Sequence, residues 1–169
     1  MNTEIITIGD ELLIGQITDT NSQWIANIAS ENGFQIERIT SVPDRLEVIV
    51  DTLEAAAKRS GVVFITGGLG PTNDDITRKA ISNFFNTGWE VNQHVYDDIR
   101  VFLRKRGVEM SELNAEQAKT PEKADVFYNE IGTAPGMKLT KDNTIYVFMP
   151  GVQFEMKEMM KNSIIPELK

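Results

Sequence analysis

The first half of the chain alternates between short apolar runs and longer segments with helical periodicity. Apolar runs at residues 3–8, 34–42 and 62–66 predict buried strands, whereas residues 21–32 carry apolar side chains at helical spacing and end at Gly33. Strands that alternate with helices predict an α/β fold on a mainly parallel sheet with right-handed crossovers. Such a sheet gathers the carboxyl ends of its strands along one edge, where ligands bind.

Glycine, proline and aspartate follow four predicted strands. These turns are Gly9-Asp10, Pro43-Asp44, residues 67–75 and, after a predicted strand at 144–149, Pro150-Gly151. If the four strands are parallel, all four turns lie along one edge of the sheet. The second half is otherwise less regular, with predicted helices at 92–107, 111–119 and after Gly151, and short predicted strands at 126–128 and 137–139.

The turn after the third strand is rich in glycine and reads TGGLGPTNDD, from Thr66 to Asp75. Gly67, Gly68 and Gly70 permit positive φ and remove side chains that would hold a ligand away. Successive backbone N–H groups before a helix form a concave anion site. The turn lacks the Lys-Ser/Thr of a Walker A motif and the third glycine of a Rossmann fingerprint. It predicts a phosphate site, and a simple tight turn is the alternative.

Carboxylates surround this predicted phosphate site. Asp74 and Asp75 are either caps of the helix that starts near Ile76 or ligands of a divalent cation that offsets the phosphate charge. Asp10 and Asp44 at neighbouring turns would complete a metal site, although Asp44 is also well placed to cap the helix that follows it. His94 is the single histidine and is interpreted as a surface or cap residue.

The composition narrows the range of functions. The 169 residues suit one domain, and 17 basic against 25 acidic residues give a net charge of −8 with no dense basic stripe, so nucleic-acid binding is not expected. The chain has no cysteine, no apolar run that would span a bilayer and no basic segment before an apolar one at its start. We therefore expect a cytoplasmic protein that does not bind membranes.

A set of ordered motifs identifies a family resemblance. The motifs are TIGDELLIGQITDTN from Thr7, TGGLGPTNDDIT from Thr66, GTAPGM from Gly132 and PGV with Glu155. Together they resemble the amino-terminal domain of the competence/damage-inducible CinA family, within the wider molybdopterin-binding fold family of MogA, MoaB and the gephyrin G domain. The resemblance runs from Ile5 to about Pro166. It implies a three-layer α/β/α sandwich with a mostly parallel sheet.

The resemblance also implies site residues. The two aspartates that line the ligand site in the molybdopterin enzymes fall on Asp44 and Asp75, and Asp10 could join them in holding Mg²⁺, Mn²⁺ or Co²⁺. A monovalent cation could accompany this divalent ion. Asp75 or Glu155 would orient an attacking water. The residues expected to contact the ligand or its phosphates are Gly9, Asp10, Asn21, Thr66, Gly67, Gly68, Leu69, Gly70, Pro71, Thr72, Asp74, Gly136, Pro150 and Gly151. One departure from the family pattern is Gln153, where proline is usual.

The activity implied for CinA-type domains is a metal-dependent ADP-ribose pyrophosphatase that yields AMP and ribose 5-phosphate. The alternatives are binding or adenylylation of a pterin phosphate such as molybdopterin, and a non-catalytic nucleotide-binding module. The family's carboxyl-terminal deamidase domain has no counterpart in this sequence, so residues 1–169 are expected to form one CinA-type domain. Members of this fold usually self-associate, and we expect a homo-oligomer, a dimer or trimer.

Overall fold

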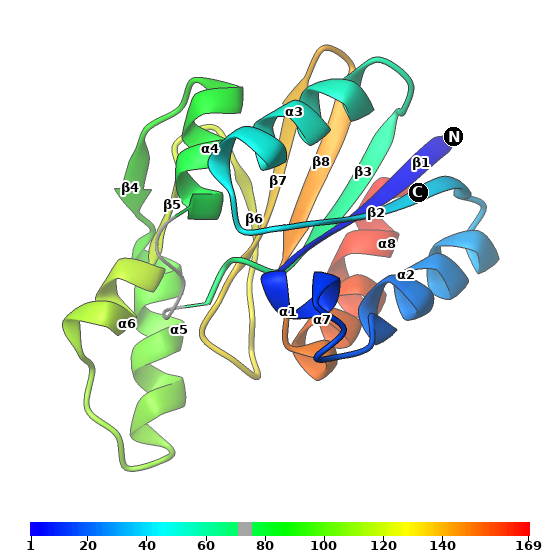
Figure 1. The fold of residues 1–169 in the computed structure, drawn as a ribbon. Helices are drawn as coiled ribbons and strands as arrows, with labels where there is room; N and C mark the ends of the chain where they lie inside the picture. The colour runs from blue at the N-terminus through cyan, green and yellow to red at the C-terminus, as the bar shows by residue number, and fades with distance from the viewer. Residues whose placement is uncertain (71–75) are drawn as a thin grey trace.

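The fold is built around one large sheet. A computed structural model of the protein describes residues 1–70 and 76–169, with a six-stranded sheet in the order β2-β1-β3-β8-β7-β6 and a separate pair of short strands, β4 and β5 (Figure 1). In chain order the elements are β1 (Asn2–Ile8), α1 (Asp10–Leu13), α2 (Thr20–Glu31), β2 (Gln35–Val42), α3 (Leu46–Ala57), β3 (Val62–Thr66), α4 (Ile76–Phe85), β4 (Trp89–Val91), α5 (Gln93–Arg104), α6 (Glu112–Gln117), β5 (Lys119–Pro121), β6 (Asp125–Phe127), β7 (Gly136–Lys141), β8 (Thr144–Met149), α7 (Gln153–Met159), the π-helix η1 (Met160–Ile164) and α8 (Ile165–Leu168).

Four strands of the large sheet run in the same direction. β1 pairs in parallel with β2 and β3, and β3 pairs in parallel with β8, whereas β7 is antiparallel to both β8 and β6. In this register Thr66 lies beside Thr7 on one side and Met149 on the other. The predicted mostly parallel sheet is confirmed, and the four predicted turns follow strands whose carboxyl ends share one edge.

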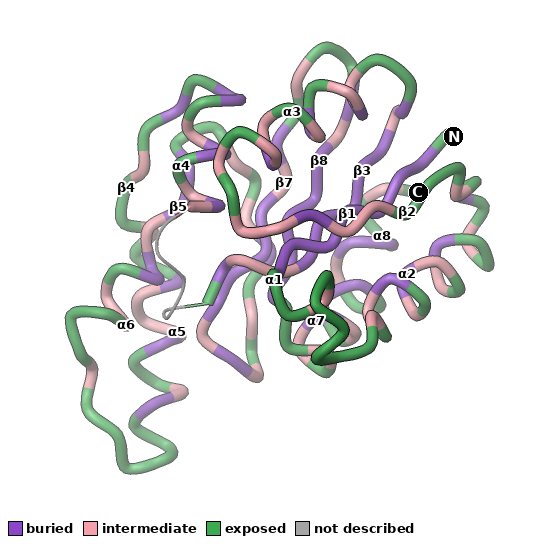
Figure 2. Tube along the Cα trace, in the orientation of Figure 1, coloured by how far each residue is buried: buried purple, intermediate pink, exposed green. Residues whose placement is uncertain are grey.

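Helices cover both faces of the sheet. Val63 and Ile65 of β3 pack with α3 and α4, and Val62 and Phe64 of the same strand pack with α2, α7, η1 and α8. This alternation follows from the two-residue period of a strand, which sends successive side chains to opposite faces. Figure 2 shows the buried residues continuing along β1, β3 and β8 between the two helical layers. A strand that is apolar on both faces is typical of a covered parallel sheet.

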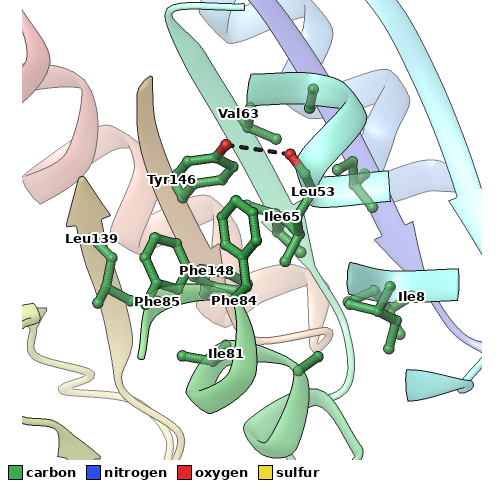
Figure 3. Close-up of a cluster of buried hydrophobic side chains, with 14 of the residues drawn as sticks. Ile8, Leu53, Val63, Ile65, Ile81, Phe84, Phe85, Leu139, Tyr146 and Phe148 are labelled. Carbon is green, nitrogen blue, oxygen red and sulfur yellow. Dashed lines mark hydrogen bonds between the residues drawn. The ribbon is translucent and has the colours of Figure 1, made fainter. Parts of the chain in front are cut away.

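Aromatic rings anchor α4 to the sheet. Phe84 and Phe85 of α4 meet Tyr146 edge to face, each with ring centroids 5.2 Å from those of Tyr146 (Figure 3). The Tyr146 hydroxyl donates to the Leu53 carbonyl at 3.3 Å, and burial raises the pKa of Tyr146 to about 12. This packing fixes the end of α4 and therefore directs its beginning, at Ile76, toward the carboxyl edge of the sheet.

The structure differs from the sequence-based expectations at several places. The small sheet of β4 and β5, the short helix α1 and the π-helix η1 were not predicted. The prediction that Asp44 caps the following helix is wrong, because α3 begins at Leu46 with Arg45 before it and without a side-chain cap. Among the described residues, no helix is long and apolar enough to cross a membrane.

A buried ion pair holds the opposite end of the sheet. Glu4 of β1 is almost fully covered, and its carboxylate accepts hydrogen bonds from Arg59 Nε at 2.5 Å and from Ser60 Oγ at 2.7 Å. Burial by itself would raise the pKa of Glu4, but the hydrogen bonds from Arg59 and Ser60 outweigh burial and lower it. The ionised form of Glu4 therefore stabilises the folded state.

We expect Glu4→Gln to lower the free energy of unfolding at neutral pH by roughly 1–3 kcal/mol. The value should lie near the lower limit of this range, because Arg59 is partly exposed to solvent. Since the pKa of Glu4 is lowered on folding, its contribution is complete above its ordinary value of 4.5 and is lost as the pH falls through the folded pKa. Urea unfolding of both proteins at several pH values measures this, and the two should converge in acid. A gap that is independent of pH would contradict the prediction.

Candidate functional site

A cavity of about 190 Å³ lies at the carboxyl ends of the parallel strands. Its walls come from the end of β1, the segment that joins β1 to α2, the end of β3 and the turn between β8 and α7. The lining residues are Thr7, Ile8, Glu11, Leu12, Ile17, Thr18, Asp19, Thr20, Asn21, Thr66, Gly67, Gly151 and Gln153. Two of the four predicted turns contribute lining residues, Gly67 and Gly151, and residues on either side of Gly9-Asp10 line the cavity as well. Four of the predicted ligand residues line it: Asn21, Thr66, Gly67 and Gly151.

The glycine-rich turn requires glycine at its first two positions. Gly67 has φ +102°, and a Cβ on it would lie 2.2 Å from the Ile8 carbonyl oxygen. Gly68 has φ +73°, and its Cβ would lie 2.0 Å from Thr77 Oγ1. Both positions therefore exclude a side chain by conformation and by contact. A Cβ on Gly70 would have no atom of the described residues within 4 Å, so these residues do not demand glycine there.

Asn21 joins two walls of the cavity. Its Nδ2 donates to the Gly151 carbonyl at 2.8 Å and to Thr66 Oγ1 at 3.4 Å, and Thr66 Oγ1 donates to the Pro150 carbonyl at 2.9 Å. The first turn of α2 is thereby tied to the ends of β3 and β8. Asn21 and Thr66 use these groups to position the turns, which fixes the shape of the cavity before a ligand arrives.

Sequence reasoning missed several lining residues. Asp19 caps α2 by accepting from the Ser22 N–H at 2.9 Å, and its other oxygen accepts from Thr7 Oγ1 at 3.2 Å. Gln153 begins α7 and donates from Nε2 to Thr20 Oγ1 at 2.8 Å, so the residue that departs from the family pattern holds α7 against α2. The Asp19-Thr20-Asn21 match to the family was the signal that could have indicated this wall.

Asp10 and Asp44 lie together beside the cavity. The Asp44 N–H donates to Asp10 Oδ1 at 3.2 Å, and the Asp10 N–H donates to Asp44 Oδ2 at 3.4 Å. Burial raises the pKa of Asp44, the charges of Asp10 and Glu11 raise it further, and the Asp10 N–H partly opposes this. These contacts explain why Asp44 does not cap α3: its carboxylate is engaged by a backbone group 34 positions earlier.

The other predicted site residues are scattered. Leu69 packs in the core beneath the turn, Gly9 donates its N–H to the Val42 carbonyl, and Gly136 packs against Met159, where a Cβ would lie 2.3 Å from the sulfur atom. Pro71, Thr72, Asp74 and Asp75 lie outside the described residues. Among residues 1–70 and 76–169, no group of three or more histidines or carboxylates is arranged to hold a metal ion.

Glu155 lies in a different cavity from the one at the strand ends. This second cavity, of about 230 Å³, is lined by Glu155 together with residues that follow β6 and residues of η1. Asn129 Nδ2 donates to Glu155 Oε2 at 2.7 Å. Burial raises the pKa of Glu155, and the Asn129 hydrogen bond only partly offsets this effect. The structure therefore does not bring Glu155 together with Asp10 and Asp44.

Two buried side chains in the described part of the chain have polar atoms without a hydrogen-bond partner: the Thr77 hydroxyl and both amide atoms of Gln117. Thr77 lies in the first turn of α4 and faces Gly68. Gln117 ends α6, where the neighbouring Glu116 carbonyl accepts a hydrogen bond from Arg78 of α4 at 2.9 Å. Unpaired buried polar groups destabilise a fold and are uncommon away from functional sites.

Gly67→Ala should lower the free energy of unfolding by more than about 2 kcal/mol, because the new methyl group meets the Ile8 carbonyl and the backbone is left-handed. Gly70→Ala is the matched control in the same turn and should unfold within about 0.5 kcal/mol of the wild type. Chemical denaturation measures both. Equal effects of the two substitutions would contradict the assignment of the close contact to Gly67.

Thr77→Val should leave the free energy of unfolding unchanged or raise it, because it removes an unpaired buried hydroxyl. Thr144→Val is the matched control: the buried Thr144 hydroxyl donates to the Ser60 carbonyl at 2.7 Å, and its loss should cost about 1 kcal/mol. Thermal unfolding of the two variants distinguishes them. A Thr77→Val protein that is as unstable as Thr144→Val would show that the Thr77 hydroxyl has a partner.

Solved structures share this architecture. The protein CinA of unknown function from Thermoplasma acidophilum has a TM-score of 0.84 and 30% sequence identity, covering 95% of this chain and 94% of that chain. The molybdopterin biosynthesis enzyme MoaB from Thermus thermophilus has a TM-score of 0.63 at 17% identity, covering 99% of this chain and 91% of that chain. The second similarity supports the fold alone, which is the predicted MogA/MoaB-like α/β sandwich.

Similar sequences occur in longer proteins. The CinA-like protein of Flavobacterium psychrophilum is 42% identical over 99% of this chain and 40% of its own length. The putative competence-damage inducible protein of Caldicellulosiruptor bescii is 41% identical over 100% of this chain and 41% of its own length. The chain therefore spans about two fifths of these curated relatives.

These relatives correct the expected enzyme class. They are named as CinA-like or competence-damage proteins, and the structural neighbours as molybdopterin biosynthesis proteins; the prediction of an ADP-ribose pyrophosphatase is wrong. The position of Glu155, which was expected to orient the attacking water, also separates it from the strand-end cavity. The family model described as a probable molybdopterin binding domain matches residues 4–169. The chain thus belongs to the probable molybdopterin-binding domain family and, within it, to the CinA-like proteins.

Proposed function

We propose that the cavity at the strand ends binds a phosphate-bearing pterin of the molybdopterin type. The observation that carries the proposal is the cavity itself, which is bounded by the Gly67 turn and by the polar residues Thr7, Thr66 and Gln153. Its position at the carboxyl edge of a parallel sheet is the usual ligand position in α/β folds. The family description supplies the ligand class: a pterin that carries a phosphate.

The charges of the cavity limit how a phosphate is held. Glu11 and Asp19 line it, and the described residues of its lining include no lysine, arginine or histidine. An anionic ligand therefore depends on backbone N–H groups and on a cation to offset the carboxylates. Asp10 and Asp44 are the described residues suited to hold that cation, because each uses one carboxylate oxygen in the reciprocal backbone bonds and keeps the second outside them.

A hard divalent ion such as Mg²⁺ fits this pair. Magnesium is commonly bound by one or two carboxylates together with the phosphate oxygens of its ligand. Burial and the charges of Asp10 and Glu11 raise the pKa of Asp44, and a cation held beside it would lower that pKa again. Asp10 and Asp44 would hold the ion, and the ion would offset the negative charge of the phosphate. Asn21 and Thr66 keep the surrounding turns in place.

Self-association of the domain stays a prediction of the family resemblance.

Calorimetric titration under anaerobic conditions tests the ligand class. With Mg²⁺ present, molybdopterin should bind at least about tenfold more tightly than ADP-ribose, a difference of about 1.4 kcal/mol. Asp44→Asn should reduce the increase in affinity that Mg²⁺ provides, because it removes one anionic oxygen ligand. Asp51→Asn on the exposed surface of α3 is the charge-matched control. Equal affinities for the two ligands, or no binding of molybdopterin, would refute the proposal.

A further inference from the structure

The second cavity is separate from the proposed pterin site and slightly larger, at about 230 Å³. It lies between the segment that follows β6, residues 128–131, and the helical segment 155–163. The π-helix η1 supplies Asn162 and Ser163 to its wall. Single turns of π-helix occur frequently at functional sites, because the wider turn displaces side chains from their regular positions.

The GTAPG motif and α7 hold one carboxylate of this cavity in a fixed position. Asn129 Nδ2 donates to Glu155 Oε2 at 2.7 Å and to the Ala134 carbonyl at 2.8 Å, and Asn129 Oδ1 accepts from the Ile131 N–H at 3.3 Å. A Cβ on Gly132 would lie 2.2 Å from the Glu155 carboxyl carbon. The asparagine therefore orients Glu155, and the glycine makes room for it. Such locked side chains are typical of prearranged binding sites.

The cavity carries negative charge and has an aromatic wall. Glu130, Glu155 and Glu158 line it, and no lysine, arginine or histidine is among the lining residues that the structure describes. Tyr128 forms part of the wall, and its ring stacks on His94 with centroids 3.9 Å apart and planes inclined by 30°. A half-buried carboxylate has lost part of its hydration, so a cation bound next to it stabilises its charged form. An aromatic wall can contact the apolar part of an organic cation.

We propose that this second cavity is a binding site for a small organic molecule with a primary ammonium group, which pairs with Glu155. The compact ammonium group has three donors, and Glu155, Asn162 and Ser163, whose side chains all carry acceptor oxygens, line the same space. The burial that raises the pKa of Glu155 is consistent with this pairing, because a bound cation would restore its ionised form. The aromatic wall at Tyr128 favours an organic cation, because its ring can contact the apolar part of such a molecule. This site is independent of the pterin proposal.

The probe is 1,4-diaminobutane, with 1,4-butanediol as its uncharged counterpart of similar size. Near neutral pH alkyl ammonium groups are fully protonated, since their pKa lies close to that of lysine, about 10.4. In low salt we expect the diamine to bind in calorimetry and the diol to give no saturable signal. Amide signals of Ile131 and Gly132 should shift in two-dimensional NMR spectra, whereas those of Thr66 and Gly67 should not. A diol that binds equally, or shifts confined to Thr66 and Gly67, would overturn the proposal.

Glu155→Gln is the decisive variant, because it keeps the size and the acceptor of the side chain and removes the charge. It should weaken diamine binding at least about fivefold, since a partly desolvated charge pair contributes on the order of 1 kcal/mol or more. Glu109→Gln removes the same charge from an exposed loop and should leave the affinity within about twofold of the wild type. The melting temperature of Glu155→Gln should be equal or higher, as a buried charge is lost. Undetectable binding to the wild type, or equal loss in both variants, would overturn the proposal.

A second measurement keeps the test valid if Glu155→Gln melts at a lower temperature. Gly132→Ala should displace the Glu155 carboxylate by contact with the new methyl group and should therefore also weaken diamine binding. Normal binding of the diamine to a folded Gly132→Ala protein would overturn the proposed pairing. Retained molybdopterin binding in both variants would show that the two sites are separate. If the wild-type protein does not bind molybdopterin, the pterin proposal fails, and the diamine result is judged by itself.

Discussion

The close approach of Gly67 to the Ile8 carbonyl sets the geometry of the carboxyl edge. β1 and β3 pair in parallel up to Thr7 and Thr66, and the chain then turns sharply at Gly67 with φ +102°. A residue with a side chain would push the turn away from β1 and open the wall of the cavity. Hydrogen bonds from Asn21 to the Gly151 carbonyl and from Thr66 to the Pro150 carbonyl join the turn after β8 to this edge. The cavity therefore depends on backbone contacts more than on charged side chains.

Much of this edge was predictable from sequence. Strand β8 lies at the predicted residues 144–149, and the turns after β1, β2, β3 and β8 share the predicted edge. These features were predictable because an apolar run, and the glycine or proline that ends it, can be recognised within a few neighbouring residues. The family resemblance predicted the fold. The strands of the small sheet have three residues each, too short to produce a pattern. The pairing of Asp44 with Asp10 was expected from the neighbouring turns, but the alternative that Asp44 caps α3 was wrong because its carboxylate accepts from the distant Asp10 N–H instead.

The placement of Glu155 shows a different limit. Gln153 and Glu155 stand two positions apart in the first turn of α7, and two residues on an α-helix are separated by about 200° around its axis. Gln153 therefore faces the strand-end cavity, and Glu155 faces the second one. The sequence placed both near the end of β8 correctly but did not specify the rotation of the helix. The carboxylate expected at the first site is thus available to a second site.

One short helix separates the two cavities, and this has a thermodynamic consequence. The first turn of α7 is held to α2 through Gln153 and Thr20, and to the segment after β6 through Glu155 and Asn129. A ligand that shifts or stiffens α7 from either side changes the free energy of binding on the other side. Linkage requires this coupling to be reciprocal: each ligand alters the dissociation constant of the other by the same factor. If both proposed sites bind their ligands, α7 is the element through which the occupancy of one would change the affinity of the other.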